Sequence, residues 1–336
     1  MSTVTLQPLR KPLFWVLVPT YNPGPQVWGQ WVHALQTQTC KPLQVVVVDS
    51  GSTDGSLALS QQAGFTVFHT QAAHFNHGAT RQWALDQALQ AAPEVPEYVV
   101  LLTQDALLAD HNALQDLISA FQNPMVAAVY GRQLPKPDAT WLEAHARTFN
   151  YPGVSRTVQW QDKERLGIKT CFLSNSFAAY RLKALQQIGG FPSNLPLGED
   201  TYSAAQLLKE GHHIAYQATA SVYHSHNYNG LLDFQRMFDT GVFHAQNKWL
   251  LQTFGSAEGE GMRLLKSQWQ FLKQLQQGQA TNFQATKPSL LWGVAQLLST
   301  NCIKLLGYKT GRAFRYLPKA LLYKFAMHKA FWQQQP

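Results

Sequence analysis

Two apolar segments, each closely followed by an aspartate, constrain the fold of this chain most strongly. Residues 44–48 end in four valines and lead directly into Asp49, and residues 98–102 are aromatic or aliphatic and come just before Asp105. Such near-continuous runs are typical of strands buried on both faces, and therefore of a parallel sheet. Ligands of open parallel sheets bind beyond the carboxyl ends of the strands. Two acids at that edge indicate a nucleotide and a metal ion.

Further apolar segments alternate with helical patterns along the first 230 residues, which predicts βαβ units in an α/β fold with a mostly parallel sheet flanked by helices. A helix carrying Trp28, Trp31 and Leu35 is expected after the first strand. Residues 131–170 are polar and contain three prolines, so we expect an extended loop with helical pieces there. The expected strands are residues 14–18, 44–48, 66–69, 98–102, 125–130, 173–180 and 221–224, and the other expected helices are 56–63, 78–91, 112–121, 181–188 and 199–210.

The chain beyond residue 230 is expected to be helical and differs in charge from the rest. After Glu260 there are eleven Lys and Arg residues and no acid, whereas residues 1–260 hold 16 basic and 19 acidic residues. The net charge of +8 therefore arises in the C-terminal region. Its basic residues are interleaved with aromatic ones, which suits a lipid headgroup layer and also nucleic acid. An apolar stripe from Leu290 to Leu305 is more often a core-facing helix than a membrane anchor.

Composition excludes several classes of protein. An apolar content of 45% and a charged content of 14% indicate a folded globular chain. The three cysteines, Cys40, Cys171 and Cys302, form no CxxC pair, which argues against a disulfide framework or a thiolate zinc site and favours a reducing compartment. Residues 1–11 lack the apolar stretch of a signal peptide, and no apolar run reaches the ~18–20 residues of a membrane span.

A series of short motifs, in this order, resembles the family 2 glycosyltransferases of the GT-A fold. Residues 75–81 and 224–228 look more narrowly like the bacterial rhamnosyltransferases of O-antigen and capsule synthesis, and so do residues 306–309 and 324–332. The family motifs are Val18-Pro19-Thr20-Tyr21-Asn22, Val48-Asp49-Ser50-Gly51-Ser52-Thr53-Asp54, Asp105, Gly189-Gly190-Phe191 and Gly198-Glu199-Asp200.

This resemblance implies a Rossmann-like GT-A fold with a helical C-terminal extension. Residues 1–230 would form the nucleotide-sugar-binding and catalytic domain. Residues 231–336 would form a basic, aromatic-rich helical region that associates with a membrane surface. The activity implied is that of an inverting, metal-dependent glycosyltransferase.

Tyr21 and Asp49 are the first candidates for binding the nucleotide. An aromatic ring after the first strand can stack on a uracil or thymine ring, and a carboxylate after the second can accept hydrogen bonds from a base N–H or a ribose hydroxyl. The resemblance places Asp49 in this role. The alternative is that Asp49 caps the turn formed by residues 50–52.

Three more residues of these motifs are expected among the nucleotide-sugar-binding residues. They are Pro19, Gln104 and Arg81. Arg81 lies in the first turn of an expected helix, and its guanidinium could pair with a phosphate or hold a carboxylate in place. An exposed helix arginine without a role remains the alternative.

Asp105 is the expected metal ligand. A departing sugar diphosphate accumulates negative charge, which a divalent cation with oxygen ligands stabilises. The family usually carries Asp-x-Asp here, but this chain has Thr103 in the first position, so one carboxylate remains. His224 and His226 share a face of an extended strand, and His224 is the better candidate to complete the shell. The cofactor expected is Mg²⁺ or Mn²⁺. Alternatively, Asp105 caps a helix.

Asp200 is the expected catalytic base, and Glu199 would help to position it or the acceptor. Displacement at a sugar C1 requires that a proton leave the acceptor hydroxyl, and a carboxylate within hydrogen-bond reach can take it. The second acid of the family's Glu-Asp pair has this role, which corresponds to Asp200. The competing interpretation is that both acids complement the dipole at a helix N-terminus.

The subgroup resemblance also implies the partners. The donor would be dTDP-L-rhamnose and the acceptor a lipid-linked glycan or oligosaccharide, at the inner face of the cytoplasmic membrane. Two alternatives remain. A sugar nucleotidyltransferase would need a basic loop after the first strand, and residues 19–24 contain no Lys or Arg. A nucleic-acid-binding protein is disfavoured by the acidic balance of residues 1–260, so no nucleic-acid partner is expected.

Overall fold

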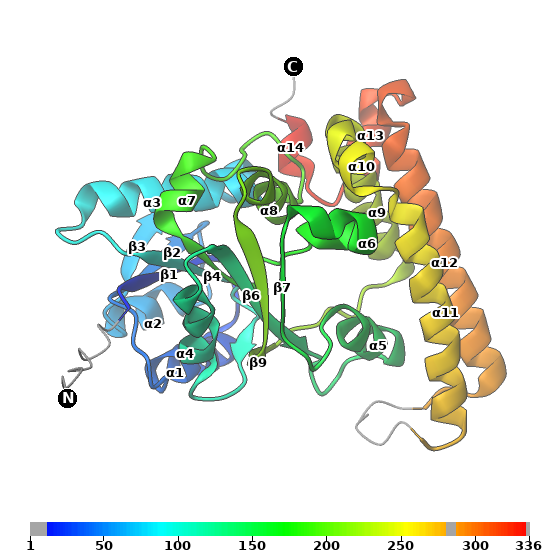
Figure 1. Cartoon of the computed structure of the whole chain (residues 1–336), viewed down its shortest axis with the longest axis horizontal. Helices are drawn as coiled ribbons and strands as arrows, with labels where there is room; N and C mark the ends of the chain where they lie inside the picture. Colours follow the sequence, from blue (N-terminus) through cyan, green and yellow to red (C-terminus); the bar gives the residue numbers. More distant parts are fainter. Residues whose placement is uncertain (1–11, 280–286, 334–336) are drawn as a thin grey trace, which may run out of the picture.

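The computed structural model describes residues 12–279 and 287–333, which contain a central nine-stranded sheet flanked by helices (Figure 1). The strand order is β3-β2-β1-β4-β8-β6-β9-β5, with β7 beside β9. The strands are β1 Phe14–Thr20, β2 Gln44–Asp49, β3 Thr66–His69, β4 Tyr98–Leu102, β5 Leu107–Leu108, β6 Val126–Leu134, β7 Arg156–Val158, β8 Phe177–Arg181 and β9 His213–Tyr223.

The helices lie on both faces of this sheet and continue beyond its far edge. Helices α1, α2 and α4 pack on one face, and α3, α7 and α8 pack on the other. The helices are α1 Pro25–Gln36, α2 Ser56–Gln62, α3 His77–Ala91, α4 Ala113–Ser119, α5 Trp141–Asn150, α6 Lys163–Leu166, α7 Leu182–Gln187, α8 Glu199–Lys209, α9 Gly230–Gln246, α10 Lys248–Phe254, α11 Ala257–Gln276, α12 Leu290–Arg312, α13 Lys319–Phe325 and α14 Lys329–Gln333.

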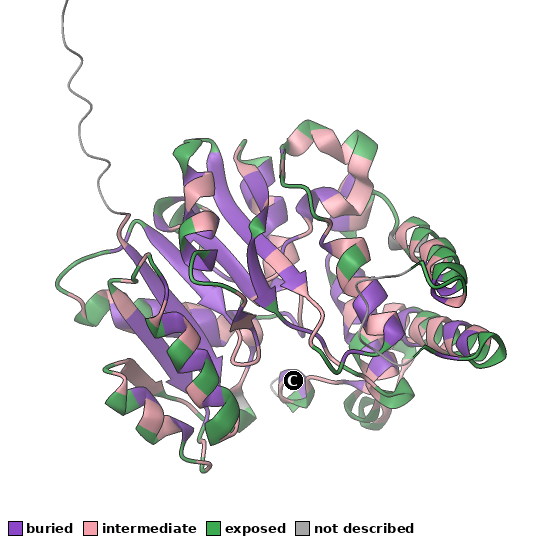
Figure 2. Cartoon of the chain, turned by 90° about the horizontal axis from the view of Figure 1, so that it is seen from below, coloured by how far each residue is buried: buried purple, intermediate pink, exposed green. Residues whose placement is uncertain are grey.

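The parallel part of the sheet is the part that the apolar runs predict. β1 pairs in parallel with both β2 and β4, and β2 pairs in parallel with β3. All seven residues of β1 are buried, because Trp15 and Leu17 pack against one helical layer while Val16 and Val18 pack against the other. Figure 2 shows these strands buried between the two layers. Continuous burial on both faces is what made these strands readable from the sequence.

The second half of the sheet departs from the expected pattern. β8 runs antiparallel to both β4 and β6, whereas β6 and β9 are parallel. β8 begins at Phe177 rather than at residue 173, since a turn precedes it in which the Phe177 amide donates to the Ser174 carbonyl at 3.2 Å. β9 begins at His213, eight residues before the strand predicted at 221. Its first half, with small and polar residues among the apolar ones, lacks the Val/Leu run that marks a buried strand.

The expected loop over residues 131–170 is also more regular than predicted. β6 extends to Leu134, and the segment then forms α5, β7 and α6. β7 adds an antiparallel strand to β9. The polar composition of this segment reflects its place beside the sheet edge rather than an absence of regular structure.

The C-terminal helices pack through glycines. A Cβ atom on Gly311 would lie 2.0 Å from the carbonyl oxygen of Phe238, and one on Gly307 would lie 2.4 Å from that of Phe234. Helices α9 and α12 can therefore approach closely only because these positions carry no side chain. α12 also packs against α11, and the two form a long pair at the edge of the molecule away from β1–β3 (Figure 1).

The apolar stripe of α12 is mostly exposed, which differs from the core-facing role considered above. Leu297 is buried, but Leu290, Leu298 and Leu305 are exposed, and Leu291 is 86% exposed. By length and composition α12 could cross a membrane, which the sequence analysis did not expect. Its 18-residue window has a mean hydropathy of 1.2 and is 17% buried. The helix thus presents an apolar outer face while its glycine face holds it to α9.

Candidate active site

The loops after β1 and β2 are joined at the carboxyl edge of the sheet. The Asn22 amide donates to the Ser52 hydroxyl at 2.9 Å, and the Thr53 amide donates to the Asn22 side-chain oxygen at 2.8 Å. The Gly24 amide donates to the Asp54 carboxylate at 2.6 Å. These bonds fix two loops side by side at the edge where open parallel sheets bind ligands.

Gln104 ties the loop after β4 to the same edge. Its side-chain oxygen accepts from the Tyr21 amide at 2.7 Å, and its side-chain nitrogen donates to the Tyr21 carbonyl at 3.2 Å. The Tyr21 side chain is left 51% exposed. Pro19 is buried within β1. Gln104 therefore holds the backbone that presents the Tyr21 ring.

The Asp49 carboxylate is buried beneath these loops. Its Oδ2 accepts from the amides of Gly51 and Ser52, each at 3.0 Å, which is the turn cap that the sequence left as an alternative. Its Oδ1 receives only a long contact, 3.5 Å, from the Thr20 hydroxyl. One oxygen of Asp49 thus shapes the turn, and the other has capacity for a further hydrogen bond.

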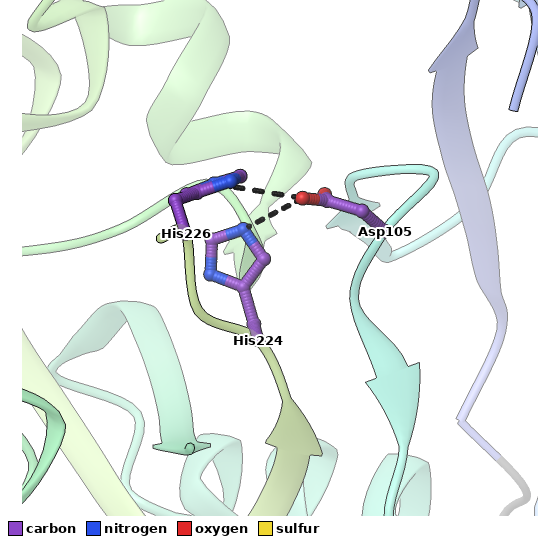
Figure 3. A group of neighbouring side chains, drawn as sticks. All are labelled: Asp105, His224 and His226. Atoms are coloured by element: carbon purple, nitrogen blue, oxygen red, sulfur yellow. Dashed lines mark ion pairs between the residues drawn. The ribbon is translucent and has the colours of Figure 1, made fainter. Parts of the chain in front are cut away.

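Asp105, His224 and His226 form a compact cluster between the ends of β4 and β9 (Figure 3). The Asp105 Oδ2 lies 3.4 Å from Nε2 of His224 and 3.5 Å from Nε2 of His226. The three ligand atoms lie within 4.8 Å of one another. The structure therefore brings together the two predicted metal-site residues and adds His226, which the sequence analysis ranked below His224.

The electrostatics of this cluster suit a cation. Burial tends to raise the pKa of Asp105, but its contacts with His224 and then His226 hold that pKa well below its usual range. Burial lowers the pKa of His224, and lowers the pKa of His226 to about 4. Near neutral pH the cluster thus offers an ionised carboxylate and two neutral imidazoles. This donor set fits a divalent cation.

Glu199 and Arg81 form a buried ion pair beside this edge. Nη1 of Arg81 lies 2.5 Å from Oε1 of Glu199, and the Asn175 side chain donates to the same oxygen at 3.1 Å. Only 2% of the Arg81 surface is exposed. Arg81 was expected either to pair with a phosphate or to hold a carboxylate in place, and in the structure it holds the Glu199 carboxylate. The pair ties the start of α3 to the start of α8.

Asp200 opens α8 next to this pair. Gly198 precedes the helix with a φ of 85°, a conformation that glycine adopts readily. The Asp200 Oδ1 accepts from the Thr201 amide at 2.7 Å, and Oδ2 accepts from the Asn175 amide at 3.4 Å. Burial and then the Glu199 charge raise the pKa of Asp200 to about 7, while the Thr201 amide and the Arg81 charge work in the opposite direction. A carboxylate with this pKa can act as a general base near neutral pH.

Hydrogen bonds connect the Asp200 region with the Asp105 cluster. Nδ1 of His224 lies 2.9 Å from the side-chain oxygen of Gln133, whose nitrogen donates to the Ser174 hydroxyl at 2.9 Å. The next residue, Asn175, contacts Asp200. Side-chain contacts and one peptide bond therefore link the candidate cation ligands to the candidate base.

Comparison with known proteins identifies the family. The model of glycosyl transferase family 2 matches residues 15–189, more than half of the chain. The chain belongs to this family. It is 44% identical over 321 residues to the O-antigen chain rhamnosyltransferase WbaN of Salmonella anatum, with 96% of each chain covered. It is 42% identical over 318 residues to the O-antigen chain rhamnosyltransferase RfbN of Salmonella typhimurium, with 94% of this chain and 95% of that protein covered.

Solved structures agree with this glycosyltransferase in fold. The mannosyltransferase PcManGT from Pyrobaculum calidifontis, in complex with GDP-Man and Mn²⁺, superposes with a TM-score of 0.56 at 20% identity, covering 99% of this chain and 91% of that one. S. aureus TarS 1-349, in complex with UDP-GlcNAc, superposes with a TM-score of 0.50 at 15% identity, covering 91% and 93%. The predicted GT-A fold is confirmed, and family membership favours glycosyl transfer over sugar nucleotidyl transfer.

Four residues at the site of this glycosyltransferase escaped the sequence analysis. Gln133 and Arg147, whose Nη1 donates to the Gln133 side-chain oxygen, fell within the expected loop of residues 131–170, so no strand register placed them. The Tyr228 ring stacks on His226, with centroids 5.0 Å apart and planes 6° apart, and exposed Arg236 donates from Nη1 to the Tyr228 hydroxyl at 3.2 Å. The two-residue spacing of His224, His226 and Tyr228 could have identified Tyr228 as a neighbour of the histidines.

Proposed function

We propose that this glycosyltransferase transfers L-rhamnose from dTDP-L-rhamnose, with inversion at C1, to a lipid-linked or oligosaccharide acceptor in bacterial surface polysaccharide synthesis. One observation carries the proposal: a chain of contacts links the Asp105 cluster to Asp200 in a protein that covers nearly the full length of two O-antigen rhamnosyltransferases. Residues 1–230 would supply the nucleotide-sugar and catalytic site.

In this proposal the nucleotide binds over the joined loops after β1, β2 and β4. The exposed Tyr21 ring stacks on the base, and Oδ1 of Asp49 accepts from a base N–H or a ribose hydroxyl. Gln104 and Pro19 hold the backbone of the Tyr21 loop in place. The proposal is supported by the exposure of Tyr21 and by the open acceptor capacity of Asp49.

Asp105, His224 and His226 would hold a divalent cation. A bound cation would supply positive charge to the diphosphate as the bond to the sugar breaks. Two imidazole ligands favour Mn²⁺ over Mg²⁺, which prefers an all-oxygen shell. Arg236 adds a positive charge beside Tyr228, whose ring stacks on His226.

Asp200 would take the proton of the acceptor hydroxyl. Its raised pKa places ionisation near neutral pH, so the carboxylate can be present and still be basic enough to accept a proton. Glu199, fixed by Arg81 and Asn175, stabilises the start of α8 and adds the negative charge that raises the pKa of Asp200. Attack then occurs on C1 from the face opposite the leaving diphosphate, which gives an inverted product.

We further propose that residues 231–336 hold the enzyme at the inner face of the cytoplasmic membrane. Support comes from two features of this region. The first is its excess of basic residues, which attracts anionic headgroups. The second is the exposed apolar outer face of α12, which can enter the headgroup layer.

A thermal-stability screen with nucleotide sugars tests the donor and the cation together. A ligand that binds the folded protein raises its Tm by mass action. We expect dTDP-L-rhamnose with Mn²⁺ to give the largest shift, and EDTA to reduce it strongly. Asp105→Asn should lose the metal-dependent part of the shift. A larger shift with another nucleotide sugar would overturn the proposed donor, and a shift insensitive to EDTA would overturn the cation.

A further inference from the structure

Gln133 lies at the back of the Asp105 cluster and is 2% exposed. Its side chain contacts three groups. The oxygen accepts from Nη1 of Arg147 and lies 2.9 Å from Nδ1 of His224, and the nitrogen donates to the Ser174 hydroxyl at 2.9 Å. All of its polar atoms are therefore engaged within the protein.

Arg147 fixes which end of the Gln133 amide faces His224. A guanidinium only donates hydrogen bonds, so the atom that faces Arg147 must be the amide oxygen. The same oxygen faces Nδ1 of His224. Two acceptors at 2.9 Å would repel, so Nδ1 of His224 carries a proton and donates it to Gln133.

The proton on Nδ1 determines the state of the other ring nitrogen. In a neutral imidazole only one nitrogen carries a proton, so Nε2 of His224 presents a lone pair. That lone pair lies 3.4 Å from the Asp105 carboxylate, which also offers only lone pairs. In the opposite tautomer Nε2 would donate a hydrogen bond to Asp105. Neither of these two ligand atoms would then be free to bind a cation.

We propose that Gln133, oriented by Arg147, is a positioning residue that holds His224 in the Nδ1–H tautomer and so keeps Nε2 and Asp105 available to a divalent cation. The inference rests on the proposed cation site. A metal-bound imidazole commonly donates its second N–H to a fixed acceptor, and loss of such an acceptor typically weakens metal binding about 10- to 100-fold.

Two variants of Gln133 separate this role from simple packing. Gln133→Met removes the acceptor, whereas Gln133→Glu keeps an acceptor toward both Arg147 and His224, and the Ser174 hydroxyl can turn to donate. Gln268→Met is the matched control, because Gln268 is also 2% exposed but pairs with Asn301 between α11 and α12. Arg147→Met frees the amide to turn and repeats the test if Gln133→Met does not fold.

The measurements are Mn²⁺ binding to metal-free protein by calorimetry, and the ¹⁵N shifts of the His224 ring at about pH 8, where an ordinary histidine is neutral. We expect Gln133→Met to bind Mn²⁺ about 10- to 100-fold more weakly and to show the Nε2–H tautomer. Gln133→Glu and Gln268→Met should keep the parent's tautomer and bind Mn²⁺ at least nearly as tightly as the parent.

Two results would overturn the proposal. One is a Gln133→Met protein that binds Mn²⁺ like the parent, and the other is an unchanged His224 tautomer in that variant. A parent protein that binds no Mn²⁺ would instead contradict the proposed cation site. The ring ¹⁵N shifts would still decide whether Gln133 sets the tautomer, so the two failures are distinguishable.

Discussion

At the scale of single residues, Asp200 is the group whose environment is most clearly matched to a chemical task. Replacing its carboxylate by an amide removes the base while keeping the shape of the side chain and one of its two amide contacts, because an amide has a single acceptor oxygen. We expect Asp200→Asn to lower turnover by about 10²–10⁴-fold and to leave donor binding unchanged. The assay is release of dTDP from dTDP-L-rhamnose in the presence of acceptor. Asp86→Asn, an exposed change on α3, is the control. Turnover at the parental rate would remove Asp200 from the mechanism.

The pH dependence of the parent enzyme follows from the same residue. The base must be ionised to accept a proton, and the pKa of Asp200 is raised to about 7 by burial and by Glu199. We therefore expect kcat/KM to rise as the pH increases through about 7 and to level off above it. A profile that is already flat from about pH 5 upward would show that Asp200 ionises like an ordinary carboxyl.

The site residues that could be predicted were those with a chemical signature in a short motif. Asp105 and His224 stood at strand ends, where the topology of a parallel sheet places ligands. The ion-pair partner of Arg81 could not be predicted from the sequence, because Glu199 lies 118 residues away and only the packing of α3 against α8 brings the two together. Gln133 gave no signal at all, since an amide acquires its role only through its neighbours.

At the scale of elements, strand burial decided what the sequence could reveal. β1, β2 and β4 carry continuous apolar residues because helices cover both faces, and they were predicted within two residues of their observed bounds. The first half of β9 mixes Ile214 and Tyr216 with polar and small residues, so it was missed. Its strand character comes from pairing with β6 and β7, which a local pattern does not encode.

The last described segment of the chain docks on α9 through Asp239. Its carboxylate is fully buried and accepts from the amides of Met327 at 3.1 Å and His328 at 2.9 Å. The His328 ring then lies 4.8 Å from the ring of His77, at the start of α3. The chain after α13 thus returns to the catalytic part of the molecule.

This contact makes stability depend on pH. Burial raises the pKa of Asp239 from 3.8 to about 7, so between these values the folded protein holds a proton that the unfolded chain releases. Stability is therefore lost as the pH rises from about 4 to about 7, by at most about 4 kcal/mol, and the loss levels off above that. The Tm of Asp239→Asn relative to the parent should rise over this range. A Tm difference that does not change with pH would contradict the prediction.

At the scale of the whole molecule, the central sheet and the C-terminal helical region share a core. Phe243 of α9 and Leu250 and Phe254 of α10 pack into the same cluster as β1 and β4, while Phe238 packs with the C-terminal segment. The predicted boundary at residue 230 stays a prediction. The two regions are nevertheless coupled mechanically, so a membrane-bound C-terminal region would set the orientation of the active site.

Vesicle flotation tests the membrane contact on which that orientation depends. We expect the protein to float with vesicles rich in anionic lipid, to bind neutral vesicles weakly, and to be released by salt. Leu291→Gln combined with Trp292→Gln should reduce binding, because both side chains are exposed on α12. Val154→Gln, an equally exposed apolar residue between α5 and β7, should not. Loss of binding in the control and not in the α12 variant would locate the membrane contact elsewhere.

We propose that a cation, a nucleoside diphosphate and a catalytic carboxylate meet at one site. Crystals grown with Mn²⁺ and dTDP test it most directly, through an anomalous difference map measured at the manganese edge. We expect one strong peak among Oδ2 of Asp105 and the Nε2 atoms of His224 and His226, with the dTDP phosphates beside it and Asp200 facing them. A peak elsewhere, or a nucleotide bound away from the ends of β1, β2 and β4, would contradict it.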